Sequence, residues 1–114
     1  MKHIMRLNPI PFESIANGTK TVELRLYDEK RRKLRIGDVI EFVSTENGSR
    51  TVEVRVTDLL LFDSFDALYK SLPLSACGYA EDELDTASPE DMEQYYSKEK
   101  QAQYGVVGIQ IALL

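Results

Sequence analysis

The sequence predicts a mixed α+β domain, and three observations lead to this fold class. Strand-like apolar patterns stand near both ends of the chain and in its middle. Helix signals, with cap residues and prolines at first positions, lie between them. The chain has 114 residues, of which 43% are hydrophobic, and this is enough for one core. We therefore predict a single domain over residues 1–114.

The first half of the chain is predicted to hold one short helix and four strands. The helix covers residues 11–16 and stops at Asn17-Gly18, because glycine tolerates the conformation found just past a helix end. Asn47-Gly48 favours a tight type I′ hairpin turn, which needs positive φ at both positions. The predicted strands span residues 3–7, 20–26, 39–43 and 50–61.

The second half is predicted to hold two helices and a closing strand. The first helix begins at Asp63 or Ser64, and the second runs from Ser88 to about Gln101, with proline at its first position. Residues 106–114 are apolar on both faces, so this strand is expected inside the sheet. A small barrel that pairs the first and last strands would bury the sheet edges.

Composition excludes several classes of protein. No apolar run approaches the roughly 18 residues that cross a membrane, and Asn8-Pro9 interrupts the start before a signal-peptide core can form. Cys77 has no partner for a disulfide, and one Cys with one His cannot supply four zinc ligands. We expect a cytoplasmic protein without a membrane segment, a metal centre or a cofactor.

Charge is distributed unevenly along the chain, whose formal net charge is −5. Residues 25–35 carry six basic and two acidic groups, whereas residues 79–99 carry eight acidic groups and one basic group. This asymmetry is typical of two solvated surfaces, and it also allows one face to attract an anion. The basic segment supplies four candidate phosphate contacts, Lys30, Arg31, Arg32 and Lys33.

The most informative segment joins the first helix to the second strand. It places Gly18, Lys20, Glu23 and Arg25 in a G-x-K-x-x-E-x-R pattern. With the Gly37-Asp38 turn and the closing YGVVGI segment, this pattern resembles the ASCH domain family of the PUA-like superfamily. The resemblance covers essentially the whole chain, and the landmarks follow one another in the family's order.

The resemblance implies a small PUA-like mixed β-barrel flanked by two to three helices, with a cleft beside the first helix. It assigns Lys20, Glu23, Arg25 and Tyr96 to a cleft that binds RNA or a nucleotide or nucleoside ligand. Glu23 and Arg25 share a strand face, so the carboxylate can orient the guanidinium toward an anion. An ion pair that only fixes the strand is the alternative.

The position of Lys20 is a problem for strict alternation, which places it on the apolar face with Val22 and Leu24. Its side chain then either projects past the end of the barrel or is partly buried with a lowered pKa. Tyr95 and Tyr79 are weaker candidates for ring stacking, and Tyr96 matches the family better.

Two other functions stay open. Some ASCH proteins resemble amidohydrolases that act on N4-acetylcytidine through a Lys, Thr and Glu constellation, which would make Lys20 and Glu23 catalytic. Glu23 stands where that threonine is expected, and the distant glutamate is one of Glu81, Glu83, Glu90 and Glu93. The acidic segment could instead dock on a basic protein partner.

Overall fold

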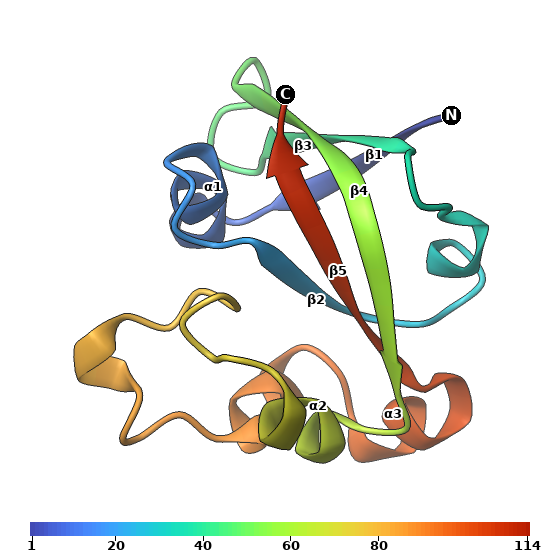
Figure 1. Cartoon of the computed structure of the whole chain (residues 1–114), viewed down its shortest axis with the longest axis vertical. Helices are drawn as coiled ribbons and strands as arrows, with labels where there is room; N and C mark the ends of the chain where they lie inside the picture. The colour runs from blue at the N-terminus through green and yellow to red at the C-terminus, as the bar shows by residue number, and fades with distance from the viewer.

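The computed structural model describes all 114 residues and shows one curled five-stranded sheet (Figure 1). The strand order is β1-β3-β4-β5-β2. β1 runs parallel to β3, and the other neighbours are antiparallel. The strands are β1 (Lys2–Leu7), β2 (Val22–Leu26), β3 (Val39–Ser44), β4 (Thr51–Phe62) and β5 (Val106–Leu113). The predicted mixed α+β class is confirmed, and the sheet forms a half-barrel.

The long strand β4 gives the sheet its curl. Its first part pairs with β3, and it then pairs with β5 along most of its length. The register shifts between Val56 and Asp58, where an irregularity of this kind bends a strand and increases its twist. β5 lies between β4 and β2, and its Val106, Val107 and Ile109 have no exposed surface. The prediction that the closing strand lies inside the sheet is confirmed.

The first and last strands do not pair, contrary to the closed barrel expected from the sequence. β5 is flanked by β4 and β2 on its two sides, so it has no free edge to offer β1. The edges of the half-barrel are β1 and β2, and side chains span the gap between them. Arg25 Nη2 donates to the Arg6 carbonyl at 2.8 Å, and Lys30 Nζ donates to the Ile4 carbonyl at 3.1 Å. These donors satisfy carbonyls of an otherwise open strand edge.

The hairpin between β3 and β4 forms, but the predicted type I′ turn is wrong. Neither Asn47 nor Gly48 has a positive φ angle. The loop is organised instead by Ser44, whose hydroxyl accepts from the backbone N–H groups of Glu46 and Asn47. Because a side chain satisfies these donors, the connection forms without positive φ angles at Asn47 and Gly48.

The helices are short: α2 (Phe65–Ser71) and α3 (Lys98–Tyr104) lie together at one end of the sheet, and α1 (Pro9–Ala16) lies apart from them (Figure 1). α2 matches the prediction, and the Ser64 hydroxyl caps it. α1 begins two residues before the predicted start at residue 11. The predicted single helix from Ser88 to Gln101 is wrong. The chain forms a 3₁₀ helix, η3 (Pro89–Gln94), breaks, and continues as α3 (Lys98–Tyr104). The Ser97 hydroxyl accepts from the Lys100 N–H and so starts a new helix at the break. Two further 3₁₀ turns are η1 (Arg31–Lys33) and η2 (Glu81–Glu83).

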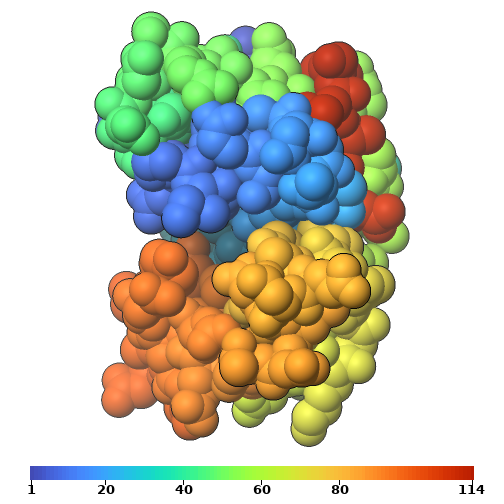
Figure 2. Space-filling model, turned by 90° about the vertical axis from the view of Figure 1, so that its left-hand side faces the viewer, coloured from blue at the N-terminus to red at the C-terminus, as the bar shows by residue number.

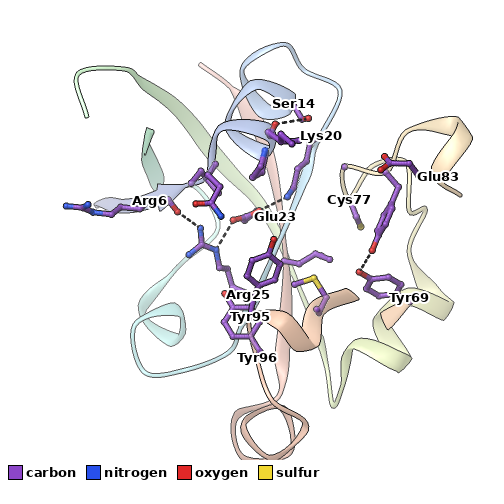
Figure 3. A pocket seen from close by; sticks show the side chains of 18 residues that line it. Arg6, Ser14, Lys20, Glu23, Arg25, Tyr69, Cys77, Glu83, Tyr95 and Tyr96 are labelled. Carbon is purple, nitrogen blue, oxygen red and sulfur yellow. Dashed lines mark hydrogen bonds and ion pairs between the residues drawn. The ribbon is translucent and has the colours of Figure 1, made fainter. Parts of the chain in front are cut away.

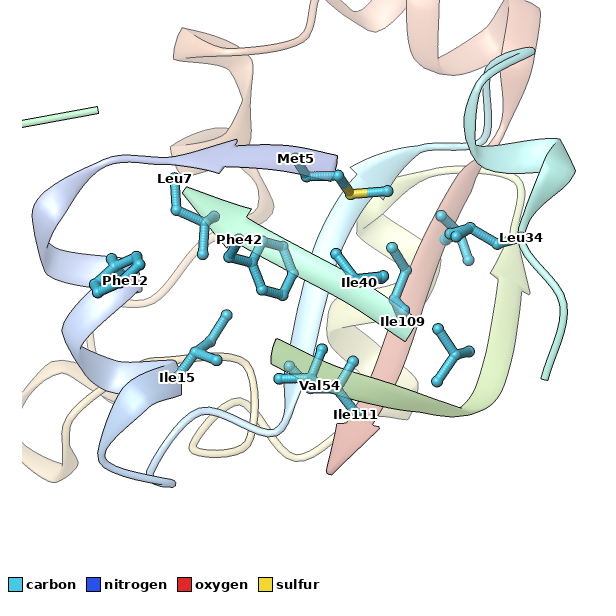
Figure 4. Packing of buried hydrophobic residues seen from close by; sticks show 12 residues of the cluster. Met5, Leu7, Phe12, Ile15, Leu34, Ile40, Phe42, Val54, Ile109 and Ile111 are labelled. Atoms are coloured by element: carbon cyan, nitrogen blue, oxygen red, sulfur yellow. The ribbon is translucent and has the colours of Figure 1, made fainter. Parts of the chain in front are cut away.

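Two buried clusters fill the two sides of the sheet. The larger one packs α1 against the concave face, and Figure 4 shows its members Met5, Leu7, Phe12, Ile15, Leu34, Ile40, Phe42, Val54, Ile109 and Ile111. The smaller one lies under α2 and consists of Val22, Leu24, Leu26, Phe65, Leu68, Cys77 and Val106. No helix is both long enough and apolar enough to cross a membrane.

Candidate functional site

A cleft of about 360 Å³ opens between α1, β2 and the chain that follows α2. In the space-filling view it is the hollow between the α1 region and the segments coloured gold and orange (Figure 2). All four side chains that the sequence assigns to a ligand line this one cleft: Lys20, Glu23, Arg25 and Tyr96. β2 supplies Glu23 and Arg25 at the floor of the cleft, so the half-barrel holds these two charged groups on a rigid element.

Lys20 reaches the cleft because it lies outside β2, which begins at Val22. Its N–H donates to the Ser14 carbonyl at 2.9 Å, so its orientation is set by α1 and not by the sheet. Strict alternation along β2 therefore does not determine where the Lys20 side chain points, because Lys20 precedes the strand. Its side chain is 10% exposed and runs to Glu23, with Nζ 2.8 Å from Oε1 (Figure 3).

A glycine allows the chain to pass closely over Lys20. Gly78 has φ +107°, and a Cβ added there would lie 3.1 Å from Lys20 Cδ. The two segments are also tied by the backbone, because the N–H groups of Thr21 and Val22 both donate to the Ala76 carbonyl. The stem of Lys20 is thus enclosed, and its ammonium is aimed at the cleft floor.

Glu23 holds the two cations of the floor in place. Its side chain is only 4% exposed, and its second oxygen, Oε2, accepts from Arg25 Nε at 2.7 Å. Burial alone would raise the pKa of Glu23, but the charges of Lys20 and Arg25 outweigh it and the pKa is lowered. Burial acts against the charged form of Arg25 too, yet the Glu23 carboxylate raises its pKa. Glu23 and Arg25 are therefore both charged at neutral pH.

The floor, formed by Lys20, Glu23 and Arg25, carries one positive charge in excess and has hydrogen-bond donors without a protein acceptor. Each oxygen of Glu23 accepts from one of the cations, and Arg25 Nη2 is used by the Arg6 carbonyl. No protein group accepts from Arg25 Nη1, and Lys20 Nζ uses only one of its three protons. An oriented guanidinium beside an ammonium favours a phosphate, a carboxylate or a ring carbonyl.

Aromatic residues form the wall that faces α1. The Tyr96 ring stacks on Phe65 at 6.0 Å, and burial raises the pKa of its hydroxyl. Beside them, Tyr69 and Tyr79 are joined through their hydroxyls at 2.7 Å, and Tyr79 donates to Asp91. This chain of hydrogen bonds fixes η3 against the segment that follows α2.

Sequence reasoning missed several lining residues. Arg6, Ile10 and Ser14 come from β1 and α1, and no local pattern marks them as neighbours of Lys20. Of the four glutamates left open as a distant partner, Glu83 alone lines the cleft. Cys77 is buried in the wall, and this burial raises its pKa to about 11, as suits a packing residue.

The four predicted phosphate contacts lie outside the cleft, and three of them already have structural partners. Lys30 donates to Ile4, Arg31 pairs with Asp28 at 3.2 Å, and Arg32 donates to the Tyr104 carbonyl. Lys33 makes no ion pair or side-chain hydrogen bond. Burial and the neighbouring charges of Arg31 and Arg25 lower the pKa of Lys30, so these cations lie close to one another beside the cleft.

A second charged group, also missed, lies away from the cleft. His3 Nε2 is 2.8 Å from Asp38 Oδ2, and the same carboxylate accepts from the Arg35 N–H and the terminal ammonium. The hydrogen bond from His3 is the main reason that the pKa of Asp38 falls to about 2. This cluster joins β1 to the turn before β3. No group of three or more His, Cys, Asp or Glu is arranged to hold a metal ion.

Comparison with solved structures places this fold among known ones. A hypothetical protein, PH0355, is 33% identical over the full length of both chains, with a TM-score of 0.82. PF0455 from Pyrococcus furiosus is 34% identical over all of this chain and 98% of its own, with a TM-score of 0.74. An ASCH protein from Zymomonas mobilis, solved as its S128A mutant, shares the fold at a TM-score of 0.71. It is 12% identical over 97% of this chain and 67% of its own.

Comparison of the sequence with curated proteins and with family models gives two results. No curated protein matches the chain. The ASCH domain family model matches residues 5–114, which includes the whole cleft and every strand except the start of β1. The resemblance inferred from Gly18, Lys20, Glu23 and Arg25 is confirmed, and the chain belongs to the ASCH domain family.

Proposed function

We propose that the protein binds RNA or a nucleotide-like ligand in this cleft, through an anion or carbonyl group held by Lys20 and Arg25. One observation carries the proposal: a buried floor with an excess positive charge and unused donors, open to a cavity of about 360 Å³. Membership of the ASCH family supports an RNA-binding role in general. The net charge of −5 limits non-specific binding to long nucleic acid.

The cations beside the cleft supply a path for a polynucleotide backbone. Arg25 and Lys30 are anchored to carbonyls two residues apart on β1, and Arg31 lies near Lys30. Arg6 lines the cleft mouth on the same strand. An RNA strand with one nucleotide in the cleft can place the neighbouring phosphates against these basic side chains.

Binding to a short single-stranded RNA, followed by fluorescence anisotropy, tests the proposal. Lys20→Met removes the ammonium and leaves the Glu23–Arg25 pair neutral, so affinity should fall about tenfold or more, since charge-assisted contacts contribute roughly 1.5–3 kcal/mol. Lys100→Met is the matched control, because Lys100 is exposed on α3 and does not line the cleft. Equal affinity of the two variants would contradict the proposal.

A second candidate is the amidohydrolase activity on N4-acetylcytidine or a related nucleoside. One observation favours it: Lys20, Glu23 and Glu83 line the same cleft. The expected threonine position is Glu23, whose oxygens are both held in ion pairs, and Thr21 is solvent-exposed. Incubation with N4-acetylcytidine and chromatography for cytidine tests this activity, with Lys20→Met as the inactive control. Release by both proteins alike would point to a contaminant.

A further inference from the structure

Two consecutive tyrosines at the end of η3, Tyr95 and Tyr96, differ in their surroundings. Both N–H groups, of Tyr95 and Tyr96, donate to the Met92 carbonyl, which ends η3. Tyr96 then packs inward on Phe65, whereas Tyr95 is 57% exposed and lines the cleft. In Figure 3 the two rings lie together beside Arg25.

The rings of Phe65, Tyr96 and Tyr95 form a row that runs from the core to the solvent. Phe65 is fully buried, Tyr96 stacks on it, and the Tyr95 ring follows at 6.3 Å from Tyr96 with a tilt of 53°. Tyr96 is thus occupied by its neighbours on the core side. Tyr95 is the outermost ring, and it has an accessible surface for a further ring.

An exposed apolar side chain also lines the cleft from α1. Ile10 is 81% exposed, in the first turn of α1. Single exposed apolar residues need no explanation, but these two share one cleft above a charged floor. Apolar surface above unused polar donors is the usual composition of a site for a small organic ligand.

We propose that Tyr95 and Ile10 hold a planar nucleobase above the Lys20–Glu23–Arg25 floor. The inference rests on the proposed function and assigns the aromatic contact to Tyr95, not to Tyr96 as the sequence suggested. Tyr95 offers its ring for stacking, Ile10 covers the base from α1, and Arg25 Nη1 donates to a ring carbonyl or nitrogen. The ligand is a nucleotide, either free or at one position of a single strand.

Calorimetric titration with the four nucleoside 5′-monophosphates tests the inference, with ribose 5-phosphate as the ring-free control ligand. Stacking of a base on an aromatic side chain is sequence-tolerant, and its loss costs about fivefold to about a hundredfold in affinity. Tyr95→Leu should therefore lower the affinity for nucleotides by this factor and leave the affinity for ribose 5-phosphate unchanged. Tyr95→Phe should bind nucleotides as tightly as the wild type. Ile10→Ser should weaken nucleotides to a smaller extent.

The outcomes separate this inference from the proposed function. If Lys20→Met weakens nucleotides and Tyr95→Leu does not, the stacking role is overturned and the cleft still binds them. If the wild type binds neither a monophosphate nor a tetranucleotide RNA, both proposals fail. If the tetranucleotide binds with much higher affinity than the monophosphate, the base belongs to an RNA strand. If the two affinities are equal, the ligand is a free nucleotide. Both results support the inference when they depend on Tyr95.

Discussion

Replacement of Glu23 by glutamine should be among the most destabilising changes of a charged side chain in this protein. The carboxylate is 4% exposed and pairs with Lys20 at 2.8 Å and Arg25 at 2.7 Å. Its neutral replacement leaves two nearly buried cations without a counter-charge. Removal of one partner from a buried ion pair costs about 3–5 kcal/mol. The glutamine oxygen still accepts one hydrogen bond, so we expect the lower end, about 3 kcal/mol.

Urea unfolding followed by circular dichroism measures this cost, and Glu41→Gln is the matched control. Glu41 is 23% exposed and pairs with the half-exposed Lys2, so its loss should cost at most about 1 kcal/mol. For a chain of this length we expect Glu23→Gln to lower the melting temperature by roughly 10–20 °C. Equal unfolding midpoints for the two variants would refute the reasoning.

Acid provides an independent check on the same ion pairs. Because the pKa of Glu23 is lowered in the folded state, its contribution to stability is complete above the unfolded pKa, near 4.5. The contribution is lost as pH falls through the folded pKa. The difference in stability between wild type and Glu23→Gln should thus be largest at neutral pH and shrink in acid. The double variant with Lys20→Met should recover part of the loss, because it removes one unpaired cation.

Three further outcomes follow from the geometry. Gly78→Ala should lower the free energy of unfolding by about 1–2 kcal/mol, because φ is +107° there, and urea unfolding measures this loss. The same change should weaken ligand binding, measured by titration, because the added methyl group displaces Lys20. Asp38→Asn should lower the urea midpoint at pH 7 and hardly change it at pH 2. The reason is that the pKa of Asp38 is lowered to about 2 in the folded state, so the stability that its carboxylate contributes disappears as pH falls from about 4 toward 2. Cys77 should react with iodoacetamide at pH 8 far more slowly in the native state than in urea, because the thiol is buried and its pKa is about 11. Equal rates would contradict that burial.

The sequence predicted most elements because their signals are local. Alternation located β2 and β4 to within two residues at either end, and the Ser64 cap located α2. Strand pairing is not local, so the expected pairing of the first and last strands was wrong, and β1 and β2 form the open edges of the half-barrel. The helix break at Tyr95–Ser97 did have a signal, because Ser97 is a second cap residue ahead of Glu99.

The candidate site divides in the same way. Glu23 and Arg25 follow from strand alternation, and the structure places them together. Lys20 could not be oriented by alternation, since the Ser14 carbonyl holds it outside the strand. The roles of Tyr95 and Ile10 depend on how η3 and α1 meet across the cleft, which involves residues 85 positions apart in the chain.

The most direct test of the central claim is a ¹⁵N–¹H NMR titration of the 13.0 kDa protein with a mixture of nucleoside monophosphates and a short RNA. The account predicts saturable shifts at residues 20–25, at 77–79 and at Tyr95, lost in Lys20→Met and kept in Lys100→Met. Saturable shifts confined to other surfaces, or none at all in the cleft, would contradict it.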